Sequence, residues 1–357
     1  MSISLCMIVK NEEHSLASCL ESAAPLMDEI IIVDTGSTDS TVDIARRYTD
    51  KVYFFEWCDD FSAARNYSLS LATSDYAIWL DADDVILPDD RALLEKTISE
   101  LDKVRPDVVF MPYNVGFDES GRLTLSYQRE RIIRLGRGLW FSGEIHEAIA
   151  PMGKMIYSKA AVTHRKQRVN EPGRNLRIFE KMAASGKKLT PRDKYYFARE
   201  LWYSGRLTDA LGYYSAVIED RLAWSENRIS ACLESSMILS SMGRMGDALE
   251  RLKIALAFGS LRADVACELG RLYFEKGELE TAKKWYLSAL SARKDGGFVT
   301  EDQKGFIPYI QLCVICDRLG RLDEAYEYNE RAGEIKPESE AYLYNKRYFE
   351  GVISPSE

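Results

Sequence analysis

The sequence lacks several features that would place it in a secreted or membrane-bound class of protein. No apolar run reaches the length of about 18 residues that a membrane-spanning helix needs, and the first residues, MSISLCMIVKNEE, reach charged positions too early for a signal peptide. The seven cysteines are scattered and do not form the regular spacing of a disulfide framework. We therefore expect a cytoplasmic protein without a membrane span, whose cysteines are reduced thiols in the core.

Motifs for several common binding sites are also missing. No G-x-G-x-x-G follows the first apolar run and no G-x-x-x-x-G-K-S/T occurs, which disfavours a Rossmann dinucleotide site and a P-loop. Cys313 and Cys316 form a C-x-x-C without a second pair, so core packing is favoured over zinc binding. The net charge of -9 disfavours a nucleic-acid partner. Residues 122–177, however, hold twelve Lys or Arg against four Glu, which indicates either an anionic ligand or a solvated face.

Apolar runs alternate with amphipathic segments in the first part of the chain. The runs that we expect to be strands are residues 3–9, 29–34, 51–55 and 76–80, and the expected helices are residues 15–24, 42–48 and 61–71. Strands that alternate with helices predict an α/β domain with a parallel sheet and right-handed connections.

Two of the expected strands end in carboxylates. Asp34 closes the second, and Asp81, Asp83 and Asp84 follow the run that ends at Leu80. Strand ends of this kind meet at one crevice, where ligands bind. Closely spaced carboxylates repel one another unless a cation or hydrogen-bond donors offset their charge, and oxygen ligands suit Mg²⁺ or Mn²⁺. The pattern therefore indicates a nucleotide and metal site, with a solvated turn before the next helix as the alternative.

Four short motifs occur in a fixed order within about the first 90 residues. They are CMIVKNE at 6–12, IVDTGSTDST at 32–41, ARN at 64–66 and WLDADD at 79–84. In this order they resemble the family-two glycosyltransferases with the GT-A fold, and FSGEIHE at 141–147 resembles a segment of members that contain helical repeats. The resemblance implies a Rossmann-like domain that binds a nucleotide sugar, with a UDP-sugar as donor and Mg²⁺ or Mn²⁺ as cofactor.

The resemblance also implies roles for individual residues. The nucleotide-binding positions are Val9, Asn11, Glu12, Asp34, Thr35, Arg65, Asp81 and Ala82, and the metal ligands are Asp83 and His164. Many relatives have Asp at the position of Thr35, so a contact to the base stays open there. A surface histidine at a domain edge is the alternative for His164. The basic residues after it either bind the diphosphate or flank a linker, and they are Arg165, Lys166, Arg168 and Arg174.

Transfer of a sugar needs a general base that removes a proton from the acceptor. The candidates are Glu144, His146 and Glu147; the resemblance favours Glu147, and Glu144 is the alternative. On an extended chain residues 144 and 146 would share one face and residue 147 the other, so we do not expect both carboxylates in one pocket. We expect the transfer to be inverting.

Beyond Pro191 the pattern is helical and repeats itself. A Gly-x4-Ala unit recurs about every 34 to 43 residues, as tetratricopeptide repeats do, at Gly205, Gly243, Gly277 and Gly320. Such helix pairs cover one another's apolar faces and form a superhelix. We expect a GT-A domain over 1–170, a linker over 171–190, and an all-α repeat domain over 191–357 that ends in a capping helix near 338–350.

These observations together predict a metal-dependent glycosyltransferase. Resemblance to the bacteriocin-modifying S-glycosyltransferases implies transfer from a UDP-sugar to a Cys, Ser or Thr side chain of a peptide or protein. One alternative is transfer to a cell-envelope glycan or a lipid-linked sugar, and another is a repeat scaffold with a degenerate catalytic half. The repeats are expected either to bind the acceptor or to form a homodimer.

Overall fold

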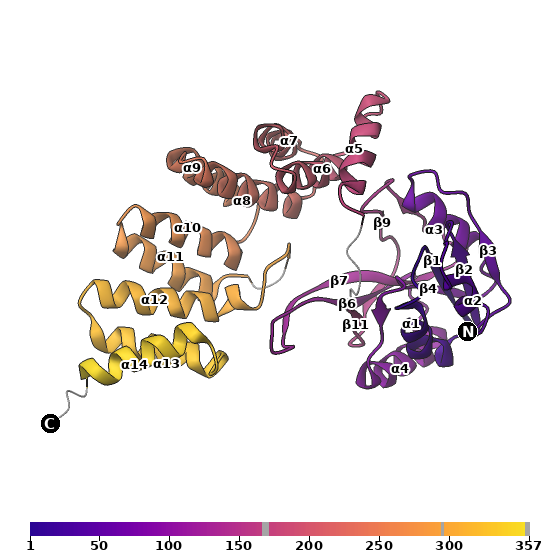
Figure 1. Ribbon diagram of the computed structural model, residues 1–357, viewed down its shortest axis with the longest axis horizontal. Coiled ribbons are helices and arrows are strands. Elements are labelled where there is room, and N and C mark those ends of the chain that lie inside the picture. Colours follow the sequence, from indigo (N-terminus) through magenta and orange to yellow (C-terminus); the bar gives the residue numbers. More distant parts are fainter. Residues whose placement is uncertain (166–170, 294–295, 354–357) are drawn as a thin grey trace. The chain divides into compact units, whose positions relative to one another are not determined.

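The computed structural model describes residues 1–165, 171–293 and 296–353 (Figure 1). The chain forms two compact units. The first consists of Met1–Gly116 and Ser126–Lys188, and the second of Phe117–Leu125 and Leu189–Glu357. The range that we expected to be a linker, 171–190, contains helix α5 (Arg174–Ala184), and most of it belongs to the first unit.

The first unit is built on a nine-stranded mixed sheet. The strand order is β3-β2-β1-β4-β7-β6-β11-β5, with β10 paired to β6. The strands are β1 (Ile3–Val9), β2 (Glu29–Asp34), β3 (Val52–Phe54), β4 (Tyr76–Trp79), β5 (Asp84–Val85), β6 (Val108–Phe117), β7 (Leu123–Arg134), β10 (Met155–Tyr157) and β11 (Val162–His164). The predicted parallel pairing is confirmed for β1 to β4, whereas β7, a strand that was not predicted from the sequence, pairs antiparallel with β4. A short hairpin turn, with no crossover helix, joins β6 to β7 and reverses the chain.

Helices cover both faces of the central strands (Figure 1). Alternate residues of β1 and β4 enter two different apolar clusters, as expected for strands buried on both sides. One cluster includes residues of α1 (Leu16–Ala23), α2 (Thr41–Ala45) and α4 (Pro88–Val104), and the other includes Leu69 of α3 (Phe61–Ser70). The helices cover the faces of the sheet, so the carboxyl ends of β1, β2 and β4 stay open at its edge.

A buried carboxylate anchors the start of β2. Glu29 accepts hydrogen bonds from Lys51 Nζ at 2.5 Å, from Thr73 N at 2.9 Å and from Ser4 Oγ. Burial raises the pKa of Glu29, but these donors outweigh burial and lower the pKa to about 2, below its ordinary 4.5.

We expect Glu29→Gln to lower the free energy of unfolding at pH 7 by about 2 kcal/mol, because the amide loses the charge-assisted bonds. The pKa of Glu29 is lower in the folded state, so its stabilisation is present above pH 4.5 and is lost as the pH falls toward 2. Urea unfolding between pH 7 and pH 3 should therefore show the difference from wild type shrinking. The exposed Glu95→Gln serves as control, and a difference independent of pH would contradict the assignment.

The described part of the second unit after Leu189 consists of antiparallel helix pairs and a terminal helix. The pairs are α6 (Pro191–Tyr203) with α7 (Leu207–Glu219), α8 (Ser225–Ser241) with α9 (Met245–Ala255), α10 (Ala263–Glu275) with α11 (Leu279–Ser291), and α12 (Phe306–Arg318) with α13 (Leu322–Ile335); α14 (Glu340–Ile353) ends the series. The predicted repeat architecture is confirmed. None of the described helices is both long and apolar enough to cross a membrane.

The repeated Gly-x4-Ala pattern has a physical basis in each pair. The glycine ends the first helix with a positive φ, which favours glycine; the four angles are 79° at Gly205, 75° at Gly243, 79° at Gly277 and 72° at Gly320. The alanines are fully buried where the paired helices approach, namely Ala210, Ala248, Ala282 and Ala325. Gly270 allows α10 and α11 to approach closely, because a Cβ there would lie 2.8 Å from the ring of Tyr286.

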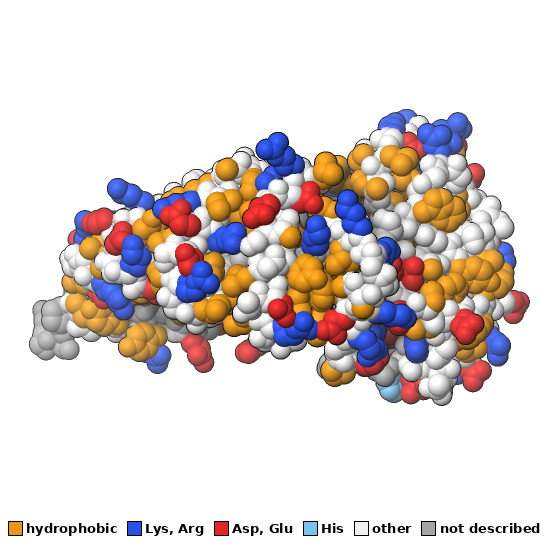
Figure 2. Space-filling view, turned by 90° about the horizontal axis from the view of Figure 1, so that it is seen from above, with side chains coloured by type: hydrophobic (Ala, Val, Ile, Leu, Met, Phe, Trp, Pro, Cys, Tyr) orange, Lys and Arg blue, Asp and Glu red, His pale blue; other side chains and the backbone are white. Residues whose placement is uncertain are grey.

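The charges and cysteines of the repeats fit this packing. Cys313 and Cys316 are buried in α12, so the packing interpretation is confirmed. All seven cysteines of the chain are free, but Cys58 is exposed and does not lie in the core as expected. Lys or Arg and Asp or Glu side chains are interspersed on the face of the repeats seen in Figure 2. Exposed ion pairs of this kind stabilise a fold little, so the repeats depend on their apolar contacts.

The second unit also includes the tip of the β6–β7 hairpin, residues 117–125. The carbonyl oxygen of Thr124 accepts a hydrogen bond from Glu301 N at 2.8 Å. Lys336 Nζ lies 3.7 Å from an oxygen of Asp118, and Arg122 pairs with Glu338. The tip is therefore held by residues near both ends of the last helix pair.

Candidate functional site

The acidic turn after β4 is held closed by its own residues and by β11. Asp84 N donates to the carbonyl of Asp81 at 3.0 Å, and Asp81 N donates to Asp84 Oδ2, also at 3.0 Å. In the antiparallel pair of β5 and β11, His164 lies opposite Asp84, and Arg165 N donates to the carbonyl of Asp83 at 2.7 Å. Strand pairing therefore places His164 beside the carboxylates.

Three side chains at this turn could hold a cation. His164 Nδ1 lies 3.4 Å from Asp83 Oδ1 and 3.3 Å from Asp84 Oδ1, and the ligand atoms of all three residues lie within 4.8 Å of one another. Burial raises the pKa of Asp83 to about 6; His164 opposes this rise and the carboxylates of Asp81 and Asp84 add to it. This concentration of oxygen and nitrogen donors fits a divalent cation.

A fully buried ion pair lies behind the acidic turn. Arg131 of β7 contacts Asp84 Oδ2 through Nη1 at 3.0 Å, and neither side chain is exposed. Tyr113 of β6 donates from its hydroxyl to Asp84 Oδ1 at 2.9 Å. Sequence reasoning missed Arg131 and Tyr113, which come from strands after the recognised motifs. In the sequence, Arg131 could have been found from its position next to the apolar residues Ile132 and Ile133.

Replacing Arg131 with Met is expected to destabilise the protein by about 3 kcal/mol, because it leaves the carboxylate of Asp84 buried without its cation. Thermal unfolding followed by circular dichroism measures the loss. Arg134→Met, three residues along the same strand and only partly buried, is the control. Equal melting temperatures for Arg131→Met and wild type would show that the pair does not stabilise the fold.

The basic segment contributes two guanidinium groups to this region. Those of Arg129 and Arg131 lie 5.0 and 4.0 Å from the centre of the Trp79 ring. These two cationic groups thus stack on Trp79, which lies in β4, the strand that leads into the acidic turn. Lys166 and Arg168, expected near the diphosphate, lie outside the described residues.

Arg65 of α3 joins the acidic turn to the segment around Glu147. Its Nη2 lies 2.5 Å from Asp81 Oδ1 and its Nε lies 2.6 Å from Glu147 Oε1. Burial lowers the pKa of Arg65, but the two carboxylates outweigh burial and raise it. The guanidinium also lies 4.8 Å from the centre of the Trp79 ring. Arg65, Asp81 and Glu147 therefore form one charged group, in which Arg65 and Glu147 are buried and Asp81 is partly exposed.

Residues 143–147 form a turn and not an extended chain. Two short antiparallel strands, β8 (Phe141–Ser142) and β9 (Ala148–Ile149), enclose a turn in which His146 has φ 51°. The side chain of Asn66 holds this segment against α3, because it accepts from Phe141 N at 2.8 Å and donates to Phe141 O at 2.9 Å.

The turn directs the three candidate bases toward different partners. Glu147 contacts Arg65, Glu144 pairs with Lys187, and the ring of His146 stacks on Phe179 of α5 at 6.2 Å. Of the three, the structure brings Glu147 together with Arg65 and Asp81.

The expected nucleotide positions lie at the ends of β1, β2 and β4. Val9 and Ala82 are buried. The carboxylate of Asp34 accepts from Gly36 N at 3.0 Å and from Ser37 N at 3.1 Å, and therefore shapes its own loop. The hydroxyl of Thr35 donates to the carbonyl of Val9 at 3.1 Å.

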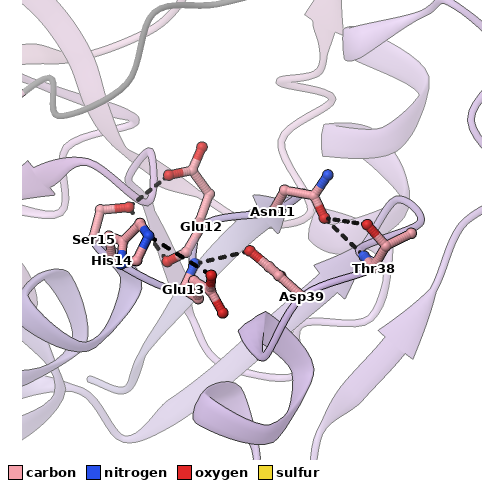
Figure 3. Close-up of a pocket in the computed structure, with 7 residues that line it drawn as sticks. All are labelled: Asn11, Glu12, Glu13, His14, Ser15, Thr38 and Asp39. Atoms are coloured by element: carbon pink, nitrogen blue, oxygen red, sulfur yellow. Dashed lines mark hydrogen bonds and ion pairs between the residues drawn. The ribbon is translucent and has the colours of Figure 1, made fainter.

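A pocket of about 490 Å³ opens between the loops that follow β1 and β2 (Figure 3). Asn11 Oδ1 accepts from Thr38 N across it at 2.7 Å, and Glu12 accepts from Ser15 Oγ at 2.5 Å. The pocket is lined by Asn11, Glu12, Glu13, His14, Ser15, Thr38 and Asp39. Two of the expected nucleotide-binding residues, Asn11 and Glu12, therefore line this open pocket.

Comparison with known proteins matches both units. Residues 4–165 match the family Glycosyl transferase family 2, and residues 263–295 match a tetratricopeptide repeat. The SPbeta prophage-derived glycosyltransferase SunS of Bacillus subtilis is 27% identical over 235 residues, which cover 62% of this chain and 54% of SunS. The lipopolysaccharide core biosynthesis glycosyltransferase LpsC of Rhizobium meliloti is 28% identical over 161 residues, which cover 43% of this chain and 59% of LpsC.

Other similarities are more limited. A TPR repeat-containing protein of Synechococcus elongatus is 46% identical over 85 residues, 24% of this chain and 21% of that protein. The structure of S. aureus TarS 1-349 in complex with UDP-GlcNAc overlaps with a TM-score of 0.40 at 15% identity, over 95% of this chain and 93% of TarS 1-349. The chain thus spans between 21% and 59% of the length of the three sequence relatives. Residues 4–165 form a glycosyl transferase family 2 domain, and the chain continues into helix pairs of which residues 263–295 match a tetratricopeptide repeat.

Proposed function

We propose that this chain is a metal-dependent, inverting glycosyltransferase that moves a sugar from a UDP-sugar to a Cys, Ser or Thr side chain of a peptide or protein. The observation that supports this most is that two groups meet at one strand end of a family 2 domain. One is the cluster of Asp83 and His164, and the other is the charged group of Arg65, Asp81 and Glu147. The placement of these residues argues against the alternative of a repeat scaffold with a degenerate catalytic half.

Each group of residues has a separate task in the proposed reaction. A divalent cation held by Asp83 and His164 would supply positive charge to the departing diphosphate. The loops at Asn11 and Asp34 bind the nucleoside at the carboxyl ends of β1 and β2. Arg65 fixes Asp81 and engages Oε1 of Glu147. We assign the other oxygen of Glu147 to the proton of the acceptor, with Glu144 as the alternative base.

The extent of the sequence similarity favours a peptide or protein acceptor. The match to SunS covers 62% of this chain, more than residues 1–188 make up, so it reaches into the repeats. This supports the resemblance to the bacteriocin-modifying S-glycosyltransferases and the proposal that the repeats bind the acceptor, with homodimer formation as their alternative role. The match to LpsC favours a second candidate function, transfer to a cell-envelope glycan.

The seven free cysteines support a cytoplasmic location, where thiols stay reduced.

The proposed function is tested by incubating the protein with a panel of UDP-sugars and Mn²⁺, and with peptides that contain Cys, Ser or Thr or with envelope glycans. We expect a peptide product of increased mass and release of UDP that requires the metal. Modification of the glycans alone would favour the second candidate, and release of UDP in the presence of a chelator would contradict metal dependence.

A further inference from the structure

The two acidic residues next to His164 differ in how many hydrogen bonds their carboxylates already accept. Asp84 is fully buried; its Oδ2 accepts a hydrogen bond from Asp81 N and forms an ion pair with Arg131 Nη1, and its Oδ1 accepts from Tyr113 and lies 3.3 Å from His164 Nδ1. Asp83 is partly exposed and contacts His164. Asp84 is therefore committed to the protein, whereas the partly exposed Asp83 is the better placed of the two carboxylates to bind a ligand.

Tyr113 connects Asp84 to the imidazole of His164. Its hydroxyl oxygen lies 2.9 Å from Asp84 Oδ1 and 3.0 Å from His164 Nδ1. A phenol has a single hydrogen, and a carboxylate paired with arginine can only accept, so the hydroxyl donates to Asp84. The same oxygen can then accept a hydrogen bond from Nδ1–H of His164, because at 3.0 Å it lies nearer to Nδ1 than Asp84 Oδ1 at 3.3 Å or Asp83 Oδ1 at 3.4 Å. With its proton on Nδ1, the imidazole has its lone pair on Nε2.

The ring of Tyr113 is itself held rigidly. The guanidinium of Arg131 lies 4.2 Å from the centre of the Tyr113 ring, and the ring of Tyr127 packs edge-on against it at 5.7 Å. Tyr113 and His164 lie on the paired strands β6 and β11, whose register places Tyr113 opposite Val162. The hydroxyl therefore has a fixed position from which it can orient the histidine.

We propose that Tyr113 is a positioning residue of the metal site. Through its hydroxyl it fixes the ring and the tautomer of His164, so that Nε2 and the carboxylate of Asp83 are the protein's ligands, and Asp84 serves as the bridge to Arg131. The inference rests on the proposed metal dependence. Groups that orient a ligating histidine in this way typically alter metal affinity by 10- to 100-fold when they are removed.

The test is Tyr113→Phe, which keeps the ring and removes the hydroxyl. We expect Mn²⁺ to bind about 10- to 100-fold more weakly, measured by calorimetry and by the electron paramagnetic resonance signal of free Mn²⁺. Binding of UDP without metal should not change. In long-range ¹⁵N–¹H spectra, which the presence of three histidines keeps simple, His164 should carry its proton on Nδ1 in wild type and change its tautomer in the variant.

Tyr67→Phe, which removes a hydroxyl from a partly buried ring on α3, is the matched control and should bind Mn²⁺ like wild type. If wild type binds Mn²⁺ and a folded Tyr113→Phe binds it equally well, the positioning role is overturned while the proposed function stands. If the wild-type protein binds no Mn²⁺, the metal dependence of the proposed function fails, and the positioning role fails with it.

Discussion

Replacing Asp83 with Asn is expected to lower kcat/KM for sugar transfer by about 10³-fold, a change of about 4 kcal/mol in transition-state stabilisation. Asp83 is the partly exposed carboxylate of the cluster with His164, and an amide keeps its size but not its charge. The loss should be largest where the departing diphosphate gains charge, so turnover should fall further than the affinity for UDP.

Calorimetry of UDP binding with and without Mn²⁺ separates the two effects. In wild type, Mn²⁺ should strengthen UDP binding, and in Asp83→Asn it should have little influence. Asp89→Asn is the matched control, since Asp89 lies in the exposed first turn of α4, six residues away along the chain. Equal and metal-independent affinity for UDP in wild type and Asp83→Asn would refute the metal site.

Replacing Glu147 with Gln is expected to lower kcat by about 10²- to 10⁴-fold, the usual effect of losing a general base. Glutamine has the size of glutamate but cannot take up the proton of the acceptor. Its amide oxygen can still accept the hydrogen bond from Arg65 Nε, so the geometry of Arg65 and Asp81 should survive. The affinity for the UDP-sugar should therefore stay close to that of wild type.

Glu144→Gln is the matched control, because Glu144 lies in the same turn but pairs with Lys187. We expect it to retain most of its activity. If Glu144→Gln shows the large loss and Glu147→Gln does not, Glu144 is the base. If Glu147→Gln instead weakens donor binding with an unchanged kcat, Glu147 only positions Arg65.

The elements that the sequence predicted well are those whose local pattern determines their structure. Strands β1 and β2 begin and end as expected, because buried apolar runs stop at a polar loop and at Asp34. The repeats were predictable because a positive φ at the end of the first helix of each pair favours glycine. Glycine therefore recurs in the sequence at a regular spacing. The carboxylates at the strand ends were likewise visible as a break in an apolar run.

The features that the sequence did not reveal depend on strand pairing and on individual dihedral angles. Arg131 and Tyr113 become neighbours of the acidic turn only through the order of β4, β7, β6 and β11 in the sheet, which local periodicity does not encode. The turn at residues 143–147 requires a positive φ at His146, a conformation that is uncommon for residues other than glycine. No residue pattern in that segment predicts it.

The hairpin tip at 117–125 has a consequence for how the chain matures during synthesis. Its partners include Glu301 and Lys336, so the tip is made about 180 residues before it can be held in place. At a translation rate of roughly 5–20 residues per second, the tip remains without these contacts for about 10 to 35 s. Strands β6 and β7 bear Tyr113 and Arg131 and lead directly into this tip. The tip should therefore become fully ordered only late in translation, long after the strands that carry it have been made.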